Sequence, residues 1–210
     1  TSYCETHALT VRQRVQLMIP VCQAIQHAHQ NGVIHRDIKP SNILIAATAP
    51  DGAPVPKVID FGIAKATGNP LIEGHATFTH AFDIVGTLEY MSPEQAEPGG
   101  PGVDVRSDVY SLGAVLYELL AGKPPIGGLS LRDSTLTSLL KRIHEEAPLP
   151  PSRQAHRHVP AECDWIALKA LEKDRERRYE SPAALGRDLQ CFLDGLPVEA
   201  GPPSTLYRLG

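Results

Sequence analysis

The sequence HRDIKPSN at residues 35–42 decides how the rest of this chain is interpreted. Two further motifs follow it in order, DFG at residues 60–62 and GTLEYMSPE at residues 86–94. Any one of these short motifs can arise by chance in an unrelated protein. The three together, in this order and with these gaps, form a signature set in which residue identities and their order are fixed jointly. One function must therefore account for all three motifs.

These motifs carry side chains suited to the transfer of a phosphoryl group, a reaction that requires mainly positioning and charge neutralisation from a protein. Asp37 is the candidate carboxylate that accepts a proton from an incoming hydroxyl. Asn42 and Asp60 offer an amide oxygen and a carboxylate to Mg²⁺ (or Mn²⁺), a type of ion that combines few protein oxygens with phosphate and water. Lys39 can neutralise the transferring phosphate. Each residue taken singly is more often a solvated loop side chain, but their joint occurrence predicts a catalytic site.

The chain resembles the carboxy-terminal lobe of the catalytic domain of bacterial Hanks-type serine/threonine protein kinases. Besides the three motifs, the stretches MSPEQA at residues 91–96 and DVYSLG at residues 108–113 carry this resemblance. Residues 21–29 and 197–203 are similar to kinases of planctomycete-type bacteria. The resemblance covers essentially the whole chain. It implies ATP-dependent, magnesium-assisted phosphoryl transfer to Ser and Thr hydroxyls of protein substrates.

The resemblance also assigns roles around the catalytic loop. Lys39 followed by proline is the variant found in serine/threonine kinases, and Thr87 matches the threonine that hydrogen-bonds the catalytic aspartate and lysine. Arg36 marks the class of kinases whose activation loop is often ordered by phosphorylation, because an exposed arginine can bind a phosphate. Thr77 and Thr79 are the candidate phosphate acceptors in that loop. The alternative is that both are unmodified polar residues.

Three further residues are expected to hold the architecture together. Glu94 resembles the glutamate that pairs with an arginine late in the lobe, and Arg178 is its expected partner. Because Arg175 stands where the family often has proline, Arg177 remains the alternative partner. Asp108 resembles the central-helix aspartate that accepts backbone hydrogen bonds from the catalytic loop.

Two apolar residues match positions that lie under the adenine ring of ATP in this family. Leu44 lies two residues beyond Asn42, and Ile59 immediately precedes Asp60. A purely structural role in the core is the alternative for both. Leu44 and Ile59 are therefore predicted cofactor-binding residues, together with Asn42 and Asp60.

The hydrophobic pattern predicts a mainly α fold with a few short β-strands, an α+β architecture like that of a protein kinase carboxy-terminal lobe. Apolar residues at helical spacing predict helices over residues 10–30, 109–120, 136–143, 163–171 and 182–192. Short apolar runs predict strands at residues 33–34, 43–45 and 57–59. Residues 62–92 show no sustained periodicity, which predicts a long functional loop.

Residues 1–193 are expected to form this lobe. Residues 194–210 are expected to be a linker toward a further module, such as a membrane segment or repeats in the parent protein. Only 34 residues precede His35, and they contain no glycine-rich phosphate loop and no Val-Ala-Ile-Lys strand. We therefore expect that the amino-terminal lobe is missing from this sequence and belongs to a longer parent. Without that lobe, the chain by itself is expected to be inactive.

Composition narrows the range of partners and compartments. The net charge of −4, with acidic and basic residues mixed, gives no basic face for nucleic acid. Four cysteines without paired spacing argue against a zinc site or a disulfide framework and suit a cytoplasmic protein. No apolar run approaches the roughly 18 residues that span a bilayer, so no membrane contact is expected from this segment. Seven of the histidines are expected to be ordinary surface residues, namely His27, His29, His75, His80, His144, His156 and His158.

Two alternatives belong to other functional classes. A pseudokinase or docking module would bind partners without catalysis, but such proteins usually lose Asp37, Asn42 or Asp60, and all three are present. A small-molecule kinase of the antibiotic-phosphorylating type has a related fold, but Lys39 and Thr87 belong to enzymes that act on peptides. Protein substrates with Ser or Thr acceptors are therefore the expected partners, together with dimerisation for trans-autophosphorylation.

Overall fold

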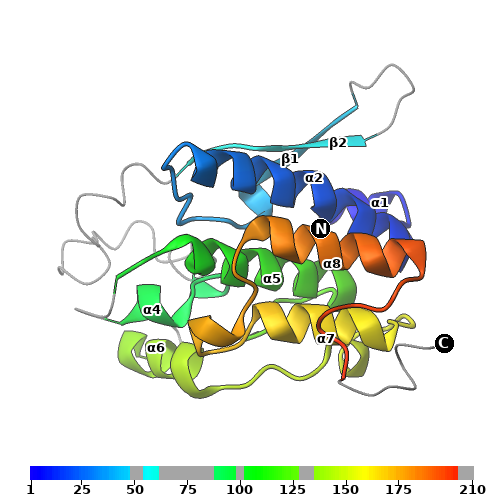
Figure 1. Ribbon diagram of the computed structural model, residues 1–210. Coiled ribbons are helices and arrows are strands. Elements are labelled where there is room, and N and C mark those ends of the chain that lie inside the picture. Colours follow the sequence, from blue (N-terminus) through cyan, green and yellow to red (C-terminus); the bar gives the residue numbers. More distant parts are fainter. Residues whose placement is uncertain (48–53, 62–87, 98–101, 128–134, 203–210) are drawn as a thin grey trace.

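The computed structural model describes residues 1–47, 54–61, 88–97, 102–127 and 135–202. Within these ranges the chain is mainly helical, with a two-stranded sheet beside the helices (Figure 1). The predicted α+β fold class is therefore confirmed. The predicted site residues Thr77, Thr79 and Thr87 lie outside the described residues.

Helix α5 lies at the centre of the molecule. The helices are α1 (Ser2–Thr6), α2 (Val11–Gln30), α4 (Pro93–Ala96), α5 (Val105–Ala121), α6 (Leu136–Glu145), α7 (Ala161–Ala170) and α8 (Pro182–Asp194). Helix α5 contacts α2, α7 and α8 (Figure 1), and every residue over 107–117 is buried. This burial on all sides explains why its sequence is apolar almost all round. Among the described helices, none is long and apolar enough to cross a membrane.

Polar side chains define where α2 and α8 begin. The backbone N–H of Thr10 donates to Gln13 Oε1 at 2.9 Å, and Gln13 N–H donates back to Thr10 Oγ1 at 3.3 Å, which is a capping box. Helix α2 then continues across Pro20 to Gln30. At α8, Ser181 Oγ accepts a hydrogen bond from Ala184 N–H at 3.2 Å. These caps satisfy backbone donors that a helix start would otherwise leave without partners.

The end of α2 shows why one predicted strand is wrong. Gly32 has a φ of 75°, in the left-handed region that favours glycine. Its N–H donates to His29 O, and Val33 N–H donates to Ala28 O, both at 3.0 Å. This pattern is a Schellman motif, which closes a helix by satisfying its last carbonyls. Residues 33–34 therefore complete the end of α2 instead of joining a sheet.

The sheet consists of β1 (Ile43–Ala47) and β2 (Pro54–Val58), which pair antiparallel with Ile43 opposite Val58. Strands lie where they were predicted at 43–45 and 57–59, but β1 continues to Ala47, and β2 begins three residues earlier and ends one residue earlier than predicted. Ile43 and Ile45 pack against the main core, whereas Leu44 between them is exposed. This alternation is expected of a strand with one face on the core.

Two glycines allow helices to approach closely. A Cβ at Gly113 in α5 would lie 2.6 Å from the Cβ of Ala170 in α7. A Cβ at Gly186 in α8 would lie 3.3 Å from the Cβ of Cys22 in α2. The main core fills the space between these four helices, and a smaller cluster lies between α4 and α6.

All four cysteines lie in the described residues and have free thiols. Cys4, Cys22 and Cys163 are buried. Burial raises the pKa of the Cys22 thiol, and likewise that of Cys163, to about 12. Both thiols therefore stay protonated and behave as small apolar side chains.

The chain beyond α8 packs against the helices for several residues. Val198 is 5% exposed, and the backbone N–H groups of Glu199 and Ala200 donate to the Asp188 carboxylate. Lys169 in α7 forms an ion pair with Glu199 at 2.6 Å. The first part of the predicted linker, up to residue 200, is therefore packed chain.

Candidate active site

The backbone of the HRD sequence is held by one carboxylate. Asp108 in α5 is completely buried. Its Oδ2 accepts a hydrogen bond from His35 N–H, and its Oδ1 accepts one from Arg36 N–H, both at 2.8 Å. The structure therefore brings Asp108 to the catalytic loop, as the sequence led us to expect from family resemblance. The central helix thus fixes the segment that precedes Asp37.

Two residues of the site adopt backbone conformations that residues other than glycine rarely adopt. Arg36 has a φ of 64° and Asp60 has a φ of 56°, both in the left-handed region. Such conformations persist only where neighbouring contacts enforce them, and they concentrate at functional sites. At Arg36 the contacts come from both sides, because Gln95 Nε2 donates to Arg36 O at 2.9 Å while Asp108 holds the N–H.

Three predicted site residues meet around the Asp37 carboxylate. Lys39 Nζ lies 3.1 Å from Asp37 Oδ2. Asn42 Nδ2 donates to the backbone carbonyl of Asp37 at 2.8 Å and also lies 3.3 Å from its Oδ2. The side chains of Asp37 and Lys39 are 16% and 23% exposed, so both remain accessible. The loop therefore presents a carboxylate and an ammonium group at one place.

Asp60 reaches the same region through the chain that follows β2. Ile59 N–H donates to Asn42 O at 3.0 Å, and His35 Nε2 lies 3.0 Å from Ile59 O. The rings of His35 and Phe61 are in contact, with centroids 4.6 Å apart. These contacts hold the chain before Asp60 against Asn42, and the Asp60 residue itself is exposed.

The donor set of Asn42 and Asp60 fits a magnesium ion carried with a nucleotide. Both side chains offer oxygen. Asn42 directs its Nδ2 toward Asp37, and its Oδ1, which accepts a hydrogen bond from Ser41 Oγ at 3.4 Å, keeps a second lone pair for a metal. Among the described residues, no three His, Cys, Asp or Glu side chains come together as a metal cage. A sparse oxygen set of this kind is what Mg²⁺ uses when phosphates and water complete its shell.

The two residues predicted to contact adenine differ in solvent exposure. Leu44 is 51% exposed on the outer face of β1, so it does not belong to the core. Ile59 is partly buried. An exposed leucine next to Asn42 provides an apolar surface beside the polar site.

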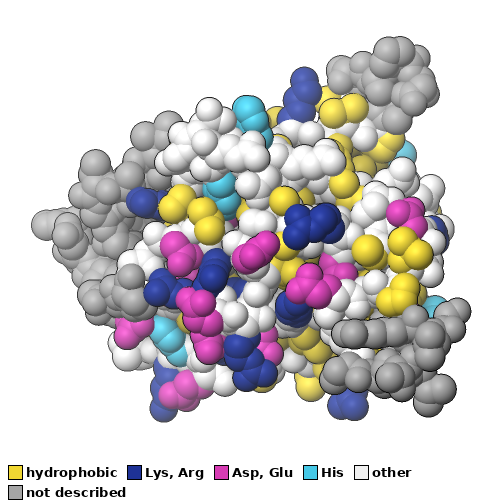
Figure 2. All heavy atoms as spheres, viewed as in Figure 1, with side chains coloured by type: hydrophobic (Ala, Val, Ile, Leu, Met, Phe, Trp, Pro, Cys, Tyr) yellow, Lys and Arg dark blue, Asp and Glu magenta, His cyan; other side chains and the backbone are white. Residues whose placement is uncertain are grey.

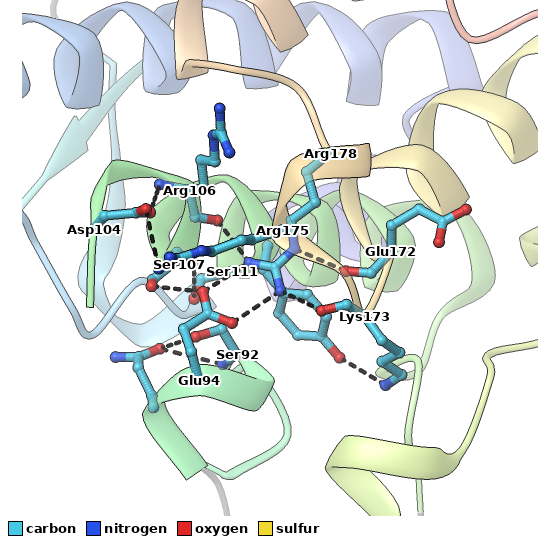
Figure 3. Close-up of polar contacts among 12 residues, drawn as sticks. Ser92, Glu94, Asp104, Arg106, Ser107, Ser111, Glu172, Lys173, Arg175 and Arg178 are labelled. Carbon is cyan, nitrogen blue, oxygen red and sulfur yellow. Dashed lines mark hydrogen bonds and ion pairs between the residues drawn. The ribbon is translucent and has the colours of Figure 1, made fainter. Parts of the chain in front are cut away.

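A buried ion pair joins α4 to the chain before α8. Arg178 Nη1 and Nη2 donate to the two Glu94 oxygens at 2.7 and 2.9 Å, and Ser107 Oγ donates to Glu94 Oε1 at 2.7 Å (Figure 3). Burial opposes the charge of Glu94, but these hydrogen bonds prevail and lower the pKa of its carboxyl. Arg177, the alternative partner, is 69% exposed and pairs with Glu172. Arg178 is therefore the arginine that meets Glu94.

Backbone carbonyls satisfy the rest of the Arg178 guanidinium. Its nitrogens donate to the carbonyls of Glu172, Lys173 and Arg106 at 2.7 to 3.0 Å (Figure 3). The guanidinium also lies 5.0 Å from the centre of the Tyr110 ring. At the protein surface, the side chain of Arg106 forms an ion pair with Glu176. On the face of the molecule drawn in Figure 2, basic and acidic side chains are interspersed.

Two contributing residues were not predicted from the sequence. Gln95 caps α4 by accepting hydrogen bonds from Ser92, and its amide nitrogen then reaches Arg36 O. His29 was expected to lie at the surface, which is wrong, because its side chain is 4% exposed and its Nε2 lies 2.7 Å from Asp108 Oδ2. Gln95 has a local signal, since Ser-Pro-Glu-Gln matches a capping box. His29 has none, because its partner lies in a different helix.

Known proteins resemble this chain over most of its length. The protein kinase domain family matches residues 2–189. Serine/threonine-protein kinase PknB of Mycobacterium leprae (strain TN) is 43% identical over 189 residues, which cover 90% of this chain and 28% of that protein. Probable serine/threonine-protein kinase PknB of Bifidobacterium longum (strain NCC 2705) is 42% identical over 194 residues, covering 92% of this chain and 26% of that protein. The chain thus spans about a quarter of the length of the curated relatives it matches.

The matched residues contain the whole site described above. They include the catalytic loop, the buried Asp108 that holds its backbone, and the Glu94–Arg178 pair. Sequence identity above 40% over nine-tenths of the chain agrees with this geometry. The chain therefore belongs to the protein kinase domain family.

Proposed function

We propose that this chain is the catalytic-loop-bearing part of a serine/threonine protein kinase, which transfers a phosphoryl group from ATP to Ser and Thr hydroxyls of proteins. The observation that carries the proposal is the cluster of Asp37, Lys39 and Asn42, with hydrogen-bond and ion-pair distances of 2.8 to 3.3 Å. These groups lie on a loop that a buried carboxylate holds at its base. Phosphoryl transfer depends mainly on positioned charges of this kind.

In this proposal Asp37 orients the incoming hydroxyl and accepts its proton. The neighbouring ammonium of Lys39, 3.1 Å away, stabilises the ionised form of the carboxylate and neutralises charge on the transferring phosphate. Asn42 holds the backbone of Asp37 through its amide nitrogen. The loop thereby holds the Asp37 carboxylate and the Lys39 ammonium group at a fixed distance from each other. This positioning lowers the free-energy cost of bringing the reactants together.

Mg²⁺ and ATP are the proposed cofactors. Asn42 and Asp60 would hold the metal, which when bound neutralises the phosphate oxygens. Leu44 and Ile59 would contact the adenine ring, and the 51% exposure of Leu44 supports that role over one in the core. The phosphate-binding loop of an amino-terminal lobe has no counterpart in this sequence. We therefore propose that residues 1–193 act as the carboxy-terminal lobe together with such a lobe.

Regulation by phosphorylation belongs to the same proposal. Arg36 has a buried Nε without a hydrogen-bond partner in the described part of the chain. A buried donor of this kind favours an anionic partner, and a phosphate on Thr77 or Thr79 would supply one. Thr87 remains the proposed partner of the catalytic residues. Dimerisation for trans-autophosphorylation and a cytoplasmic location of the catalytic part complete the proposal.

A phosphotransfer assay tests the function. The full-length protein, given labelled ATP and Mg²⁺, should label a protein substrate on Ser or Thr. Asp37→Asn should lower the rate by about 10²- to 10⁴-fold, the usual range for loss of a general base. Asp194→Asn makes the same chemical change at the exposed end of α8 and should leave the rate unchanged. A wild-type protein that transfers no phosphate to any protein would refute the proposal and favour a docking module.

A further inference from the structure

Helices α2 and α8 lie side by side, and a groove follows the line between them (Figure 1). Its first part is a hollow of about 1020 Å³ between α1, the first half of α2, the start of β2 and the end of α8. Its second part is a hollow of about 390 Å³ between the second half of α2 and the first half of α8. Ile19 and Gln190 line both hollows, so the two parts form one continuous groove.

Glutamine side chains form much of the wall of this groove. Six of the eight glutamines in the chain line it, namely Gln13, Gln16, Gln23, Gln26, Gln30 and Gln190. Gln16, Gln23 and Gln30 are exposed, and their amides form no hydrogen bond with the residues that the structure describes. A side-chain amide carries both donors and an acceptor, as a peptide group does. The wall therefore matches the hydrogen-bonding groups of an extended peptide backbone.

The proline inside α2 leaves a backbone acceptor at the same wall. Pro20 has no N–H, so the carbonyl of Gln16, four residues earlier, lacks its usual helical donor. Gln16 and Pro20 both line the larger hollow. A backbone carbonyl without its helical partner favours an occupant that brings N–H groups. A peptide backbone brings such groups at regular intervals.

The charges along the groove favour an acidic occupant. The chain has 24 Asp and Glu residues, but none lies in the twenty residues of α2, and none of the described ones lines either hollow. Arg12 in the larger hollow already donates to Leu193 O, and Asp194 beside it accepts a hydrogen bond from a lining glutamine. Arg187 in the smaller hollow is 66% exposed and lies 3.9 Å from Glu180, a weak surface pair. Arg187 is therefore the cation best placed to bind a carboxylate of the occupant.

We propose that this groove binds an extended, acidic peptide segment of a partner protein, with its backbone held by the glutamine amides and one carboxylate paired with Arg187. The 17 positions from Gln13 to Gln30 correspond to about 26 Å of helix. An extended chain rises about 3.3 Å per residue, so about eight residues fill the groove. The inference goes beyond the proposed kinase function, and its tests need no phosphoryl transfer.

Fluorescence anisotropy with the full-length protein tests this binding. The probe is a fluorescein-labelled peptide of that length with alternating Ser and Val and with Asp at both ends, so that either orientation brings a carboxylate to Arg187. It should bind about tenfold or more tightly than the same peptide with Lys at both ends. A third peptide, in which Pro replaces each Val, lacks those backbone donors and should bind about tenfold or more weakly than the acidic probe.

Two variants change the groove itself. Arg187→Gln should weaken binding of the acidic probe by about threefold to tenfold and reduce its salt dependence, because it removes the cation. Arg177→Gln, at an arginine of similar exposure outside the groove, is the matched control and should match wild type. Pro20→Ala gives the Gln16 carbonyl its helical donor. It should therefore raise the midpoint of thermal unfolding and still weaken binding by about threefold or more.

Each outcome decides the proposal. Tighter binding of the acidic probe than of the other two peptides, weakened by Arg187→Gln and by Pro20→Ala, supports it. If Pro20→Ala does not fold, Gln23→Ala at an exposed position of the same groove replaces it. No binding of the acidic probe, equal binding of the Lys or Pro peptide, or equal binding to wild type and either variant overturns the proposal. Dimerisation that Arg187→Gln abolishes, without peptide binding, assigns the groove to a second copy of the chain and also overturns it.

Discussion

The guanidinium of Arg178 and the carboxylate of Glu94 form a buried, bidentate ion pair, with nitrogen–oxygen distances of 2.7 and 2.9 Å. The two residues lie 84 positions apart in the sequence. Side-chain exposures of 0% for Arg178 and 6% for Glu94 leave the pair almost entirely shielded from water. Two parallel N–H···O bonds of this kind fix the relative orientation of the segments as well as their distance. The pair thereby ties α4, which carries Gln95 toward the catalytic loop, to the base of α8.

Replacing Arg178 should strongly lower the free energy of unfolding. Arg178→Ala leaves the Glu94 charge buried, with Ser107 as its remaining side-chain donor among the described residues. Breaking a buried pair in this way costs about 3–5 kcal/mol. Urea denaturation followed by circular dichroism measures the free energy of unfolding. Arg177→Ala, two-thirds exposed at the neighbouring position, should change it by no more than about 0.5 kcal/mol. Equal effects of the two substitutions would contradict a structural role for the pair.

The sequence predicted the parts of the site that motifs specify and missed those that depend on packing between helices. Asp37, Lys39 and Asn42 share one short loop, so their proximity follows from spacing. His29 and Asp108 lie 79 residues apart, and no periodicity indicates that the end of α2 meets the start of α5. The partner of Glu94 could be predicted only from the family resemblance. Arg177 and Arg178 are adjacent residues of the same type, and only the fold determines which of them points inward.

The helices were predictable for a related reason. Four of the predicted helices pack apolar residues into the main core, and the helix predicted at 136–143 packs into the smaller cluster. Capping residues such as Thr10 and Ser181 stand where α2 and α8 begin. The strand predicted at 33–34 failed because two apolar residues contain no information about a partner strand. There, Gly32 turned the chain back onto the last carbonyls of α2. Local turn chemistry outweighed a short apolar run.

Glu89 should make stability depend on pH. Burial, reinforced by the charge of Glu118, raises the pKa of Glu89 from its ordinary 4.5 to about 7. A carboxyl with a raised pKa in the folded state contributes stability that is fully present below pH 4.5 and is lost as pH rises through about 7. The free energy of unfolding of wild type, relative to Glu89→Gln, should therefore fall across this interval. The measurement is a series of urea titrations over this range of pH.

The control for this prediction is Glu97→Gln, which changes an exposed glutamate eight residues away in the segment after α4. Relative to Glu97→Gln, wild type should show no such trend. Curves for wild type and Glu89→Gln that run parallel from acidic to neutral pH would contradict the prediction.

The contact between α5 and α7 should not tolerate a methyl group. Gly113→Ala places a Cβ 2.6 Å from the Cβ of Ala170 and 3.3 Å from its backbone carbonyl carbon, so the two helices must move apart. Overpacking of this kind costs about 1–3 kcal/mol. Gly127→Ala adds the same methyl where the nearest atom is 3.7 Å away and should be neutral. Thermal unfolding of the two variants checks the difference, and a stability of Gly113→Ala equal to that of Gly127→Ala would show that the helices adjust freely.

The segment after α8 should count as part of the folded domain. Asp188 is 3% exposed and accepts hydrogen bonds from Tyr179 Oη at 2.6 Å and from the backbone N–H groups of Glu199 and Ala200 at 2.5 and 3.0 Å. Val198, beside these donors, is buried. A chain that ends at residue 194 loses this valine, and Tyr179 is then the remaining hydrogen-bond donor to Asp188 among the described residues. The combined cost should be about 5 kcal/mol or more before the entropy of ordering the segment is subtracted, from one buried aliphatic side chain and two lost charge-assisted hydrogen bonds.

Two truncations compared by urea denaturation locate the boundary of the domain. A chain that ends at residue 202 keeps Val198 and both backbone donors and should retain the stability that these contacts contribute. A chain that ends at residue 194 should show the loss, and Asp188→Asn in the longer chain should reproduce part of it by weakening the acceptor. Equal stability of the two truncations would place the boundary at residue 193. In that case the contacts of residues 198–200 would hold the linker against α8 without stabilising the domain, because a contact adds stability only when it exceeds the entropy lost in ordering the chain that makes it.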